Sequence, residues 1–155
     1  MRRKLLSAVF CLALLCGCSK GSWFLFKGDF FELTIPPGFT QTQKTNNLLV
    51  FESDSGKVTL TWSRDQYSIK NHPAREVVTG NPGDKILVSE EQKLGNNVVW
   101  YSEIQKKDGW SVYLTLPLDR GELRIEAISS QSIIDIRQSV RSVVITNETH
   151  FSYPR

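Results

Sequence analysis

Only two histidines, His72 and His150, are available for acid–base or metal chemistry in this chain of 155 residues. A metal site needs three or four converging ligands, and neither histidine has a Cys, Asp or Glu partner at a recognised ligand spacing. The sequence also lacks a glycine-rich phosphate loop and a dinucleotide fingerprint. We therefore interpret both histidines as surface residues, and the sequence predicts neither a metal site nor a cofactor.

The sequence gives little support for a nucleophile or a carboxylate pair. The residues of a Ser-His-Asp triad converge only in three dimensions, so the sequence does not exclude one. The Gly-x-Ser-x-Gly elbow that often carries the serine is absent, however. Glycoside hydrolysis needs two carboxyls facing each other across a cleft, whereas the acids here alternate outward beside basic residues, as on a solvated sheet face. These acids are Glu90, Glu91, Asp108, Asp119, Glu122 and Glu126. The sequence therefore predicts a non-enzyme, with a small hydrolase as the less favoured alternative.

Aromatic residues on predicted strands are more informative. Adjacent residues of a strand point to opposite faces, so Trp100 and Tyr101 cannot both lie in one core layer. At least one large ring is then either exposed, as in many protein interfaces, or covered by a helix or loop. Both alternatives stay open.

Four residues at turns and strand ends are our candidates for binding a protein partner: Asp108, Trp110, Asp119 and Arg120. Loops on a rigid sheet commonly carry recognition. The alternative interpretation is that Asp108 and Asp119 only form turns and that Trp110 belongs to the core. No feature of the sequence distinguishes the two.

Period-2 alternation of apolar residues predicts most of the elements that would position these side chains. Phe31, Leu33 and Ile35 are one example, and Pro36-Pro37-Gly38 ends that strand. Ser53-Asp54-Ser55-Gly56 predicts a hairpin turn in which Gly56 supplies a positive φ. The predicted strands cover residues 31–35, 48–52, 58–62, 85–91, 98–105, 110–116 and 122–127, and turns are predicted at 81–83, 95–97, 107–109 and 119–121.

Two helices are predicted. The first covers Asn71–Thr79, and the second begins at a capping box formed by Ser132 and Asp135. Its apolar face consists of Ile133, Ile136, Val140 and Val143, and Arg137, Gln138 and Arg141 face outward. The order of elements predicts an α+β fold: a single antiparallel sheet of about six to seven strands, with a short middle helix and a C-terminal helix packed on it.

The N-terminus has the layout of a secretory signal. A basic start, Met1–Lys4, precedes an apolar run of about 11 residues, Leu5–Leu15, which is shorter than the ~20 residues of a spanning helix. The run ends in Leu15-Cys16-Gly17-Cys18 and resembles the lipobox of bacterial lipoprotein signals. This resemblance implies that residues 1–17 are removed and that Cys18 carries the lipid.

Several expectations follow from lipidation at Cys18. By resemblance to the sorting rules of enteric lipoproteins, Ser19 after the cysteine, rather than Asp, implies the outer membrane, with the protein facing the periplasm. The full chain has 19 Lys and Arg against 16 Asp and Glu. Three of those cations and no acid lie in the signal, so the mature chain has 16 of each. A chain with no net charge gives little support for a nucleic-acid partner.

The mature chain is divided into a lipidated tether at 18–27, one globular domain at 28–146 and a C-terminal tail at 147–155. The tether contains Trp23, Phe24, Leu25 and Phe26. Two interpretations stay open: these side chains lie in the headgroup region beside the lipid, or they begin the first strand and join the core.

The mature chain also resembles the PsbP-like family, which includes DcrB-like bacterial lipoproteins. The residues that carry this resemblance are Ile35-Pro36-Pro37-Gly38-Phe39, the hairpin that follows, and a terminal helix ending in Arg141-Ser142-Val143. The predicted middle helix is shorter than the family pattern. The resemblance implies an α/β sandwich and transfers no catalytic residue.

We therefore expect a non-catalytic binding lipoprotein that engages an envelope protein or a ligand. A more specific version is an immunity protein against a periplasmic toxin. The alternative from another class is an accessory or assembly lipoprotein of a secretion system or envelope complex.

Overall fold

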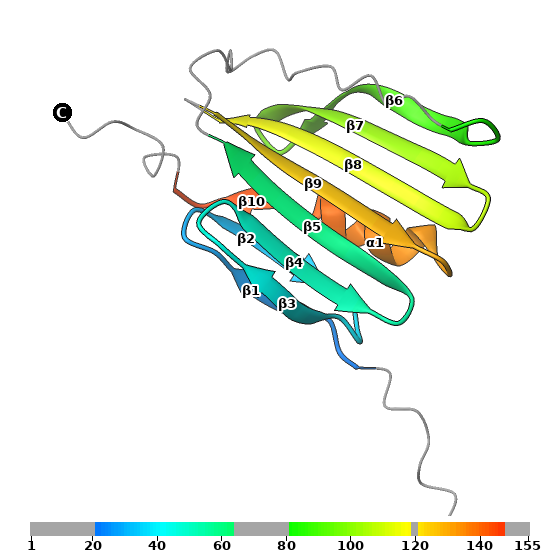
Figure 1. Cartoon of the computed structure of the whole chain (residues 1–155). Helices are drawn as coiled ribbons and strands as arrows, with labels where there is room; N and C mark the ends of the chain where they lie inside the picture. Colours follow the sequence, from blue (N-terminus) through cyan, green and yellow to red (C-terminus); the bar gives the residue numbers. More distant parts are fainter. Residues whose placement is uncertain (1–20, 64–80, 119–120, 148–155) are drawn as a thin grey trace, which may run out of the picture.

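The computed structural model describes residues 21–63, 81–118 and 121–147 (Figure 1). In this part of the chain, ten strands and one helix follow one another. They are β1 (Phe24–Lys27), β2 (Phe31–Ile35), β3 (Thr40–Lys44), β4 (Leu48–Ser53), β5 (Gly56–Ser63), β6 (Lys85–Leu94), β7 (Asn97–Lys106), β8 (Gly109–Leu118), β9 (Gly121–Ser129), α1 (Ile133–Arg141) and β10 (Val144–Ile145).

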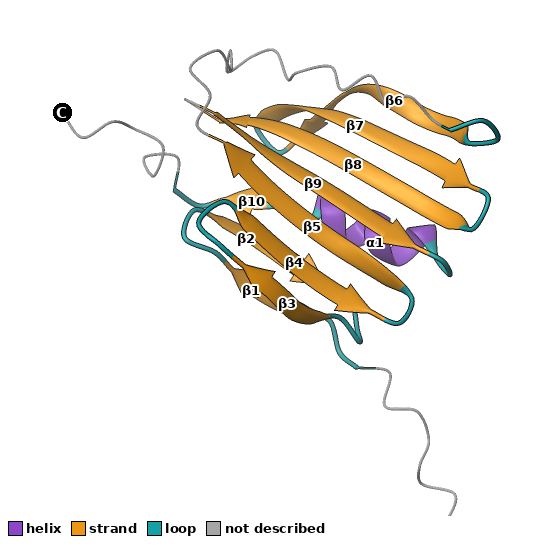
Figure 2. Ribbon diagram, viewed as in Figure 1, coloured by secondary structure: helices purple, strands orange, loops and turns teal. Residues whose placement is uncertain are grey.

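The strands form two sheets in which every pairing is antiparallel (Figure 2). The large sheet has seven strands in the order β3-β4-β5-β9-β8-β7-β6, and the small sheet has the order β1-β2-β10. The predicted α+β class, the antiparallel sheet and the docked C-terminal helix are confirmed. The small sheet is an addition, because β1 lies in the segment assigned to the tether, where a strand was one of two interpretations, and β10 has only two residues.

One face of the large sheet carries the core. Inward positions on its central strands are apolar and almost fully buried, as Leu60, Leu114 and Ile125 show, and these three residues lie side by side across β5, β9 and β8. The small sheet and α1 lie next to each other over this face (Figure 1). The fold is therefore two layers, one of them made of a sheet and a helix together.

Two serine hydroxyls join α1 to β2. The Ser139 hydroxyl donates to the Thr34 carbonyl at 2.7 Å, and the Thr34 amide donates to the Ser142 hydroxyl at 2.8 Å. Strand β10 has only two residues and pairs with Phe31 and Glu32, so it does not reach Thr34. The hydroxyls therefore satisfy backbone groups of β2 that would otherwise lack a partner.

The aromatic residues of the predicted tether begin strand β1, which was one of the two interpretations of this segment. Only some of them join the core. Phe26 packs against the core cluster. Phe24 and Leu25 are 40% and 51% exposed. The other new strand in the large sheet, β3, has the sequence TQTQK and is exposed throughout, so it lacks the apolar alternation by which strands are recognised.

Two local predictions are wrong. Gly56 does not have a positive φ; it is required because a Cβ there would collide with the carbonyl oxygen of Ile128 on β9. Arg137 does not face outward, because its guanidinium pairs with Glu103 of β7. The predicted helix at 71–79, the signal with Cys18, and residues 148–155 of the predicted tail lie outside the described residues.

Candidate functional site

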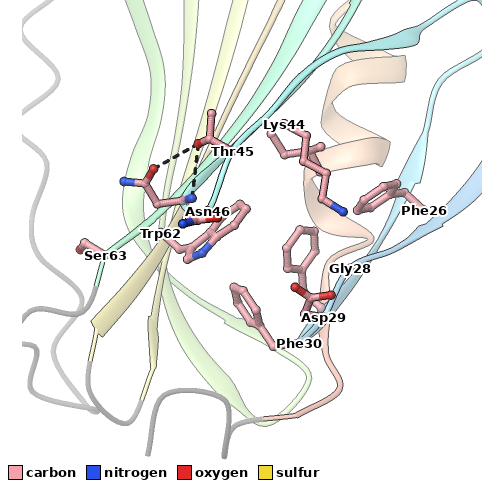
Figure 3. A pocket seen from close by; sticks show the side chains of 12 residues that line it. Phe26, Gly28, Asp29, Phe30, Lys44, Thr45, Asn46, Trp62 and Ser63 are labelled. Carbon is pink, nitrogen blue, oxygen red and sulfur yellow. Dashed lines mark hydrogen bonds between the residues drawn. The ribbon is translucent and has the colours of Figure 1, made fainter.

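A cleft of about 640 Å³ opens where the small sheet meets the β3–β4–β5 end of the large sheet (Figure 3). Residues from the β1–β2 turn, the β3–β4 turn and the end of β5 surround it. They are Phe26, Gly28, Asp29, Phe30, Phe31, Lys44, Thr45, Asn46, Asn47, Leu49, Trp62 and Ser63.

Aromatic rings form the apolar side of the cleft. Phe30 packs against Phe31 with ring centroids 5.0 Å apart and against Trp62 at 5.6 Å, and both contacts are edge-to-face. Phe26 lies 6.0 Å from Phe31. Phe30 and Phe31 are almost fully buried, whereas Phe26 and Trp62 are half-buried. Because the two buried rings hold the others in place, the apolar wall is rigid.

The β1–β2 turn places Phe30 and Phe31 through a close approach at Gly28. The Gly28 amide donates to the Phe31 carbonyl at 2.8 Å, and a Cβ at Gly28 would come within 2.9 Å of the Phe31 ring. A glycine at this position therefore lets the turn close tightly. Two consecutive phenylalanines after the turn then reach the cleft together with Trp62 of the large sheet (Figure 3).

The opposite rim is polar and internally hydrogen-bonded. The Thr45 amide donates to the Leu48 carbonyl at 2.8 Å, and the Thr45 hydroxyl donates to the Asn47 side chain at 3.2 Å. The Trp62 amide donates to the Asn47 carbonyl at 3.2 Å, which ties this turn to β5. Lys44 and Asp29 add one charge of each sign to the lining. An apolar wall with a few fixed polar groups suits an apolar group that carries a polar edge.

Two of the four predicted partner-binding residues are described by the structure, Asp108 and Trp110. Asp108 and Trp110 line a second groove of about 520 Å³, beside the β4–β5 turn. Asp119 and Arg120 lie outside the described residues. Trp110 is half-buried and packs against the core, whereas Asp108 is exposed in the β7–β8 turn.

A charged cluster between β7 and α1 was not predicted. Glu103 is 4% exposed and accepts two hydrogen bonds from the Arg137 guanidinium and one from the Tyr101 hydroxyl, each at 2.6 Å. Arg141 lies 5.0 Å over the Tyr101 ring and donates to Gln92 at 2.7 Å. The signal was present in the sequence, because Glu103 falls on the inward side of the alternation set by Val99 and Tyr101.

The ionisation of this cluster follows from its contacts. Burial raises the pKa of Glu103, but the hydrogen bonds from Arg137 and Tyr101 outweigh burial and lower it overall. Burial, and then the hydrogen bond to Glu103, raise the pKa of Tyr101. Oε1 of Glu103 accepts two of these hydrogen bonds and Oε2 accepts one, so the ionised carboxylate holds the helix on the sheet through charge-assisted bonds.

Trp100 and Tyr101 lie on opposite faces of β7. Tyr101 is buried beneath α1, and Trp100 is half-buried on the other face. Within residues 21–63, 81–118 and 121–147, no group of three or more metal-ligating side chains comes together. In the same part of the chain, no helix is long and apolar enough to cross a membrane.

Two solved structures share this arrangement. The cyanobacterial PsbP protein (CyanoP) of Synechocystis sp. PCC 6803 superposes with a TM-score of 0.53 at 11% identity, over 83% of this chain and 95% of that one. A protein of Bacteroides thetaiotaomicron superposes with a TM-score of 0.53 at 12% identity over 83% of this chain. The match spans about half of that protein's length. No family model and no curated protein matches the sequence. The chain has a PsbP-like fold.

Proposed function

We propose that this PsbP-like domain is a lipid-anchored, periplasm-facing binding module without catalytic activity. The anchor is Cys18, and the membrane is the outer membrane. Its partner is an envelope protein that inserts an apolar side chain into the cleft, or an apolar small ligand of similar shape. An immunity protein against a periplasmic toxin is the specific version of this role, because binding alone is enough to neutralise a toxin.

The aromatic cleft is the observation that carries the proposal. It offers Trp62 and Phe26 as partly accessible apolar surface beside fixed polar groups of the β3–β4 turn. Rigid aromatic surface next to hydrogen-bonding groups is the usual composition of protein-binding hot spots. Because the wall and the rim are each held by their own contacts, binding needs no costly ordering of loops.

A matched pair of variants tests the cleft. Asn46 and Asn96 are both exposed and lie in the β3–β4 and β6–β7 turns, but only Asn46 lines the cleft. We expect Asn46→Trp to fill the cleft and to abolish recovery of the partner from detergent-solubilised envelope. Asn96→Trp is expected to recover the partner like the parent. Equal recovery by both variants, with unchanged melting temperatures, would exclude the cleft as the binding site.

The accessory or assembly role is the alternative, and the lipid anchor on an outer-membrane protein favours it equally. The neighbouring genes separate the two versions. A toxin gene beside this one favours immunity, and genes of a secretion system favour assembly. A toxin-protection assay is the direct test: cells that lack this protein die on exposure to the toxin only under the immunity version.

A further inference from the structure

The small sheet has an outer face that turns away from the large sheet. Phe24 and Phe26 of β1 contact Phe51 of β4, with ring centroids 6.1 Å and 5.2 Å apart. Because side chains alternate along a strand, Leu25 and Lys27 point the other way. Glu32 and Thr34 of β2 and Val144 of β10 share that side, since they pair with these residues or with each other. These five residues make up the outer face.

The composition of the outer face is amphipathic. Leu25 and Val144 are 51% and 57% exposed. Between them lies an ion pair, with Lys27 Nζ 3.1 Å from a carboxylate oxygen of Glu32. The face therefore combines exposed aliphatic side chains with charges that cancel. Such a surface matches the headgroup region of a bilayer, where apolar groups enter the boundary and a lysine reaches the phosphates.

The distance to the anchor determines what this face meets. Leu25 follows Cys18 by seven residues, so at full extension the tether reaches only about 25 Å. Strand β8 alone, with 10 residues, is about 33 Å long. The tether is thus shorter than the domain, and β1 is the first strand that the anchored chain enters (Figure 1).

We infer that the outer face of the small sheet rests on the phospholipid headgroups of the membrane that holds the lipid anchor. This inference rests on the proposed attachment at Cys18. Leu25 and Val144 enter the headgroup boundary, and Lys27 contacts lipid phosphate. The seven-stranded sheet then lies on the far side of the small sheet, away from the membrane.

The absence of any other thiol in the proposed mature chain makes the test simple. Cys11 and Cys16 leave with the signal and Cys18 is acylated, so a cysteine introduced elsewhere is the only site for a thiol-reactive fluorophore. We choose Leu25→Cys on the outer face. The matched control is Ile128→Cys, another exposed aliphatic residue, at 36%. Ile128 lies on the side of the large sheet that faces away from the core, because its β9 neighbours Ala127 and Ser129 are buried on the other side.

The acylated mature protein carrying either probe is placed in phosphatidylethanolamine–phosphatidylglycerol vesicles, with and without a lipid that bears a nitroxide quencher on its headgroup. We expect the Leu25 probe to lose emission in the quencher vesicles and the Ile128 probe to keep it. A third probe at Val144→Cys is expected to behave like the one at Leu25.

Two results would overturn the inference: equal quenching at Leu25 and Ile128, which indicates a freely tumbling domain, or quenching at neither. A third result would also overturn it: a Leu25 probe whose emission depends on the density of protein on the vesicle and not on the density of quencher lipid. That result would assign the outer face to contact with a second copy of the chain. Mass spectrometry of the same preparations tests the anchor separately. A protein that lacks acyl chains at Cys18 refutes the proposed function, whereas an acylated protein with an unquenched Leu25 probe refutes only the inference.

Discussion

Glu103 shows how a single residue specifies the way the layers meet. Its carboxylate is buried on β7 and is compensated by Arg137 of α1 through two 2.6 Å hydrogen bonds. Such a pair adds little net stability over an apolar replacement, but a lone buried carboxylate is costly. The pair therefore fixes the position of α1 over β7, because any other docking leaves Glu103 without its partner.

Removing one partner is expected to cost much more than removing both. Arg137→Met leaves the Glu103 carboxylate buried with only the Tyr101 hydroxyl, and we expect a loss of about 2 kcal/mol or more in the free energy of unfolding. Glu103→Gln combined with Arg137→Met is expected to recover at least half of that loss. Urea denaturation at pH 7 measures both values, and a double variant less stable than the single one would contradict this account.

The same carboxylate makes stability depend on pH in a defined direction. The pKa of Glu103 is lower in the folded protein than its ordinary value of 4.5. The stability that this difference supplies is therefore complete above pH 4.5 and is lost as the pH falls through the lower, folded pKa. We expect the urea midpoint to fall between pH 5 and pH 3 by less in the Glu103→Gln, Arg137→Met variant than in the parent. Parallel pH profiles would refute this.

At the scale of elements, strands with apolar alternation were predictable and strands defined by their neighbours were not. Residues 31–35 and 110–116 were predicted as strands because every second residue is apolar and enters the core. Strand β3 has no buried residue and exists because it pairs with β4. The cleft was not predictable for a related reason: Phe30 and Trp62 are 32 positions apart and meet only when the small sheet packs on the large one.

Helix α1 provides a matched test of this layering. Val140 is fully buried against the sheet, and Ile134 on the same helix is 65% exposed. Val140→Asp buries a charge without a partner, and we expect it to destabilise the fold by about 4 kcal/mol or more. Ile134→Asp is expected to change stability by no more than about 0.5 kcal/mol. If Val140→Asp melts at the same temperature as Ile134→Asp in a thermal scan, α1 does not pack in this place.

At the scale of the whole molecule, one apolar core joins both layers. It takes side chains from β2, β4, β5, β7, β8, β9 and α1. The single antiparallel sheet predicted from the sequence omitted the small sheet, because the two residues of β10 are too short a run to show a strand pattern. The overall class was still predictable, because it follows from the long strands and the amphipathic helix.

We expect a chain beginning at Ser22 to fold by itself, without metal or disulfide, because it contains the whole apolar core cluster. Such a chain contains no cysteine. Its melting temperature is expected to be unchanged by a chelator or by a reducing agent, as measured by circular dichroism. A drop on chelation would reveal a metal whose ligands include residues outside the described ones.

The hydrogen bonds from β2 to Ser139 of α1 and to its C-cap Ser142 affect when the folded structure can form. Thr34 and Ser142 are 108 positions apart, and β10 pairs with β2 from a similar distance. In a chain that crosses a membrane N-terminus first, as proposed for this one, β2 can make these bonds only after residues 139–145 have followed it. Contacts this distant in sequence slow folding, so under the export proposed above the small sheet and α1 would come together only after the C-terminal residues have crossed.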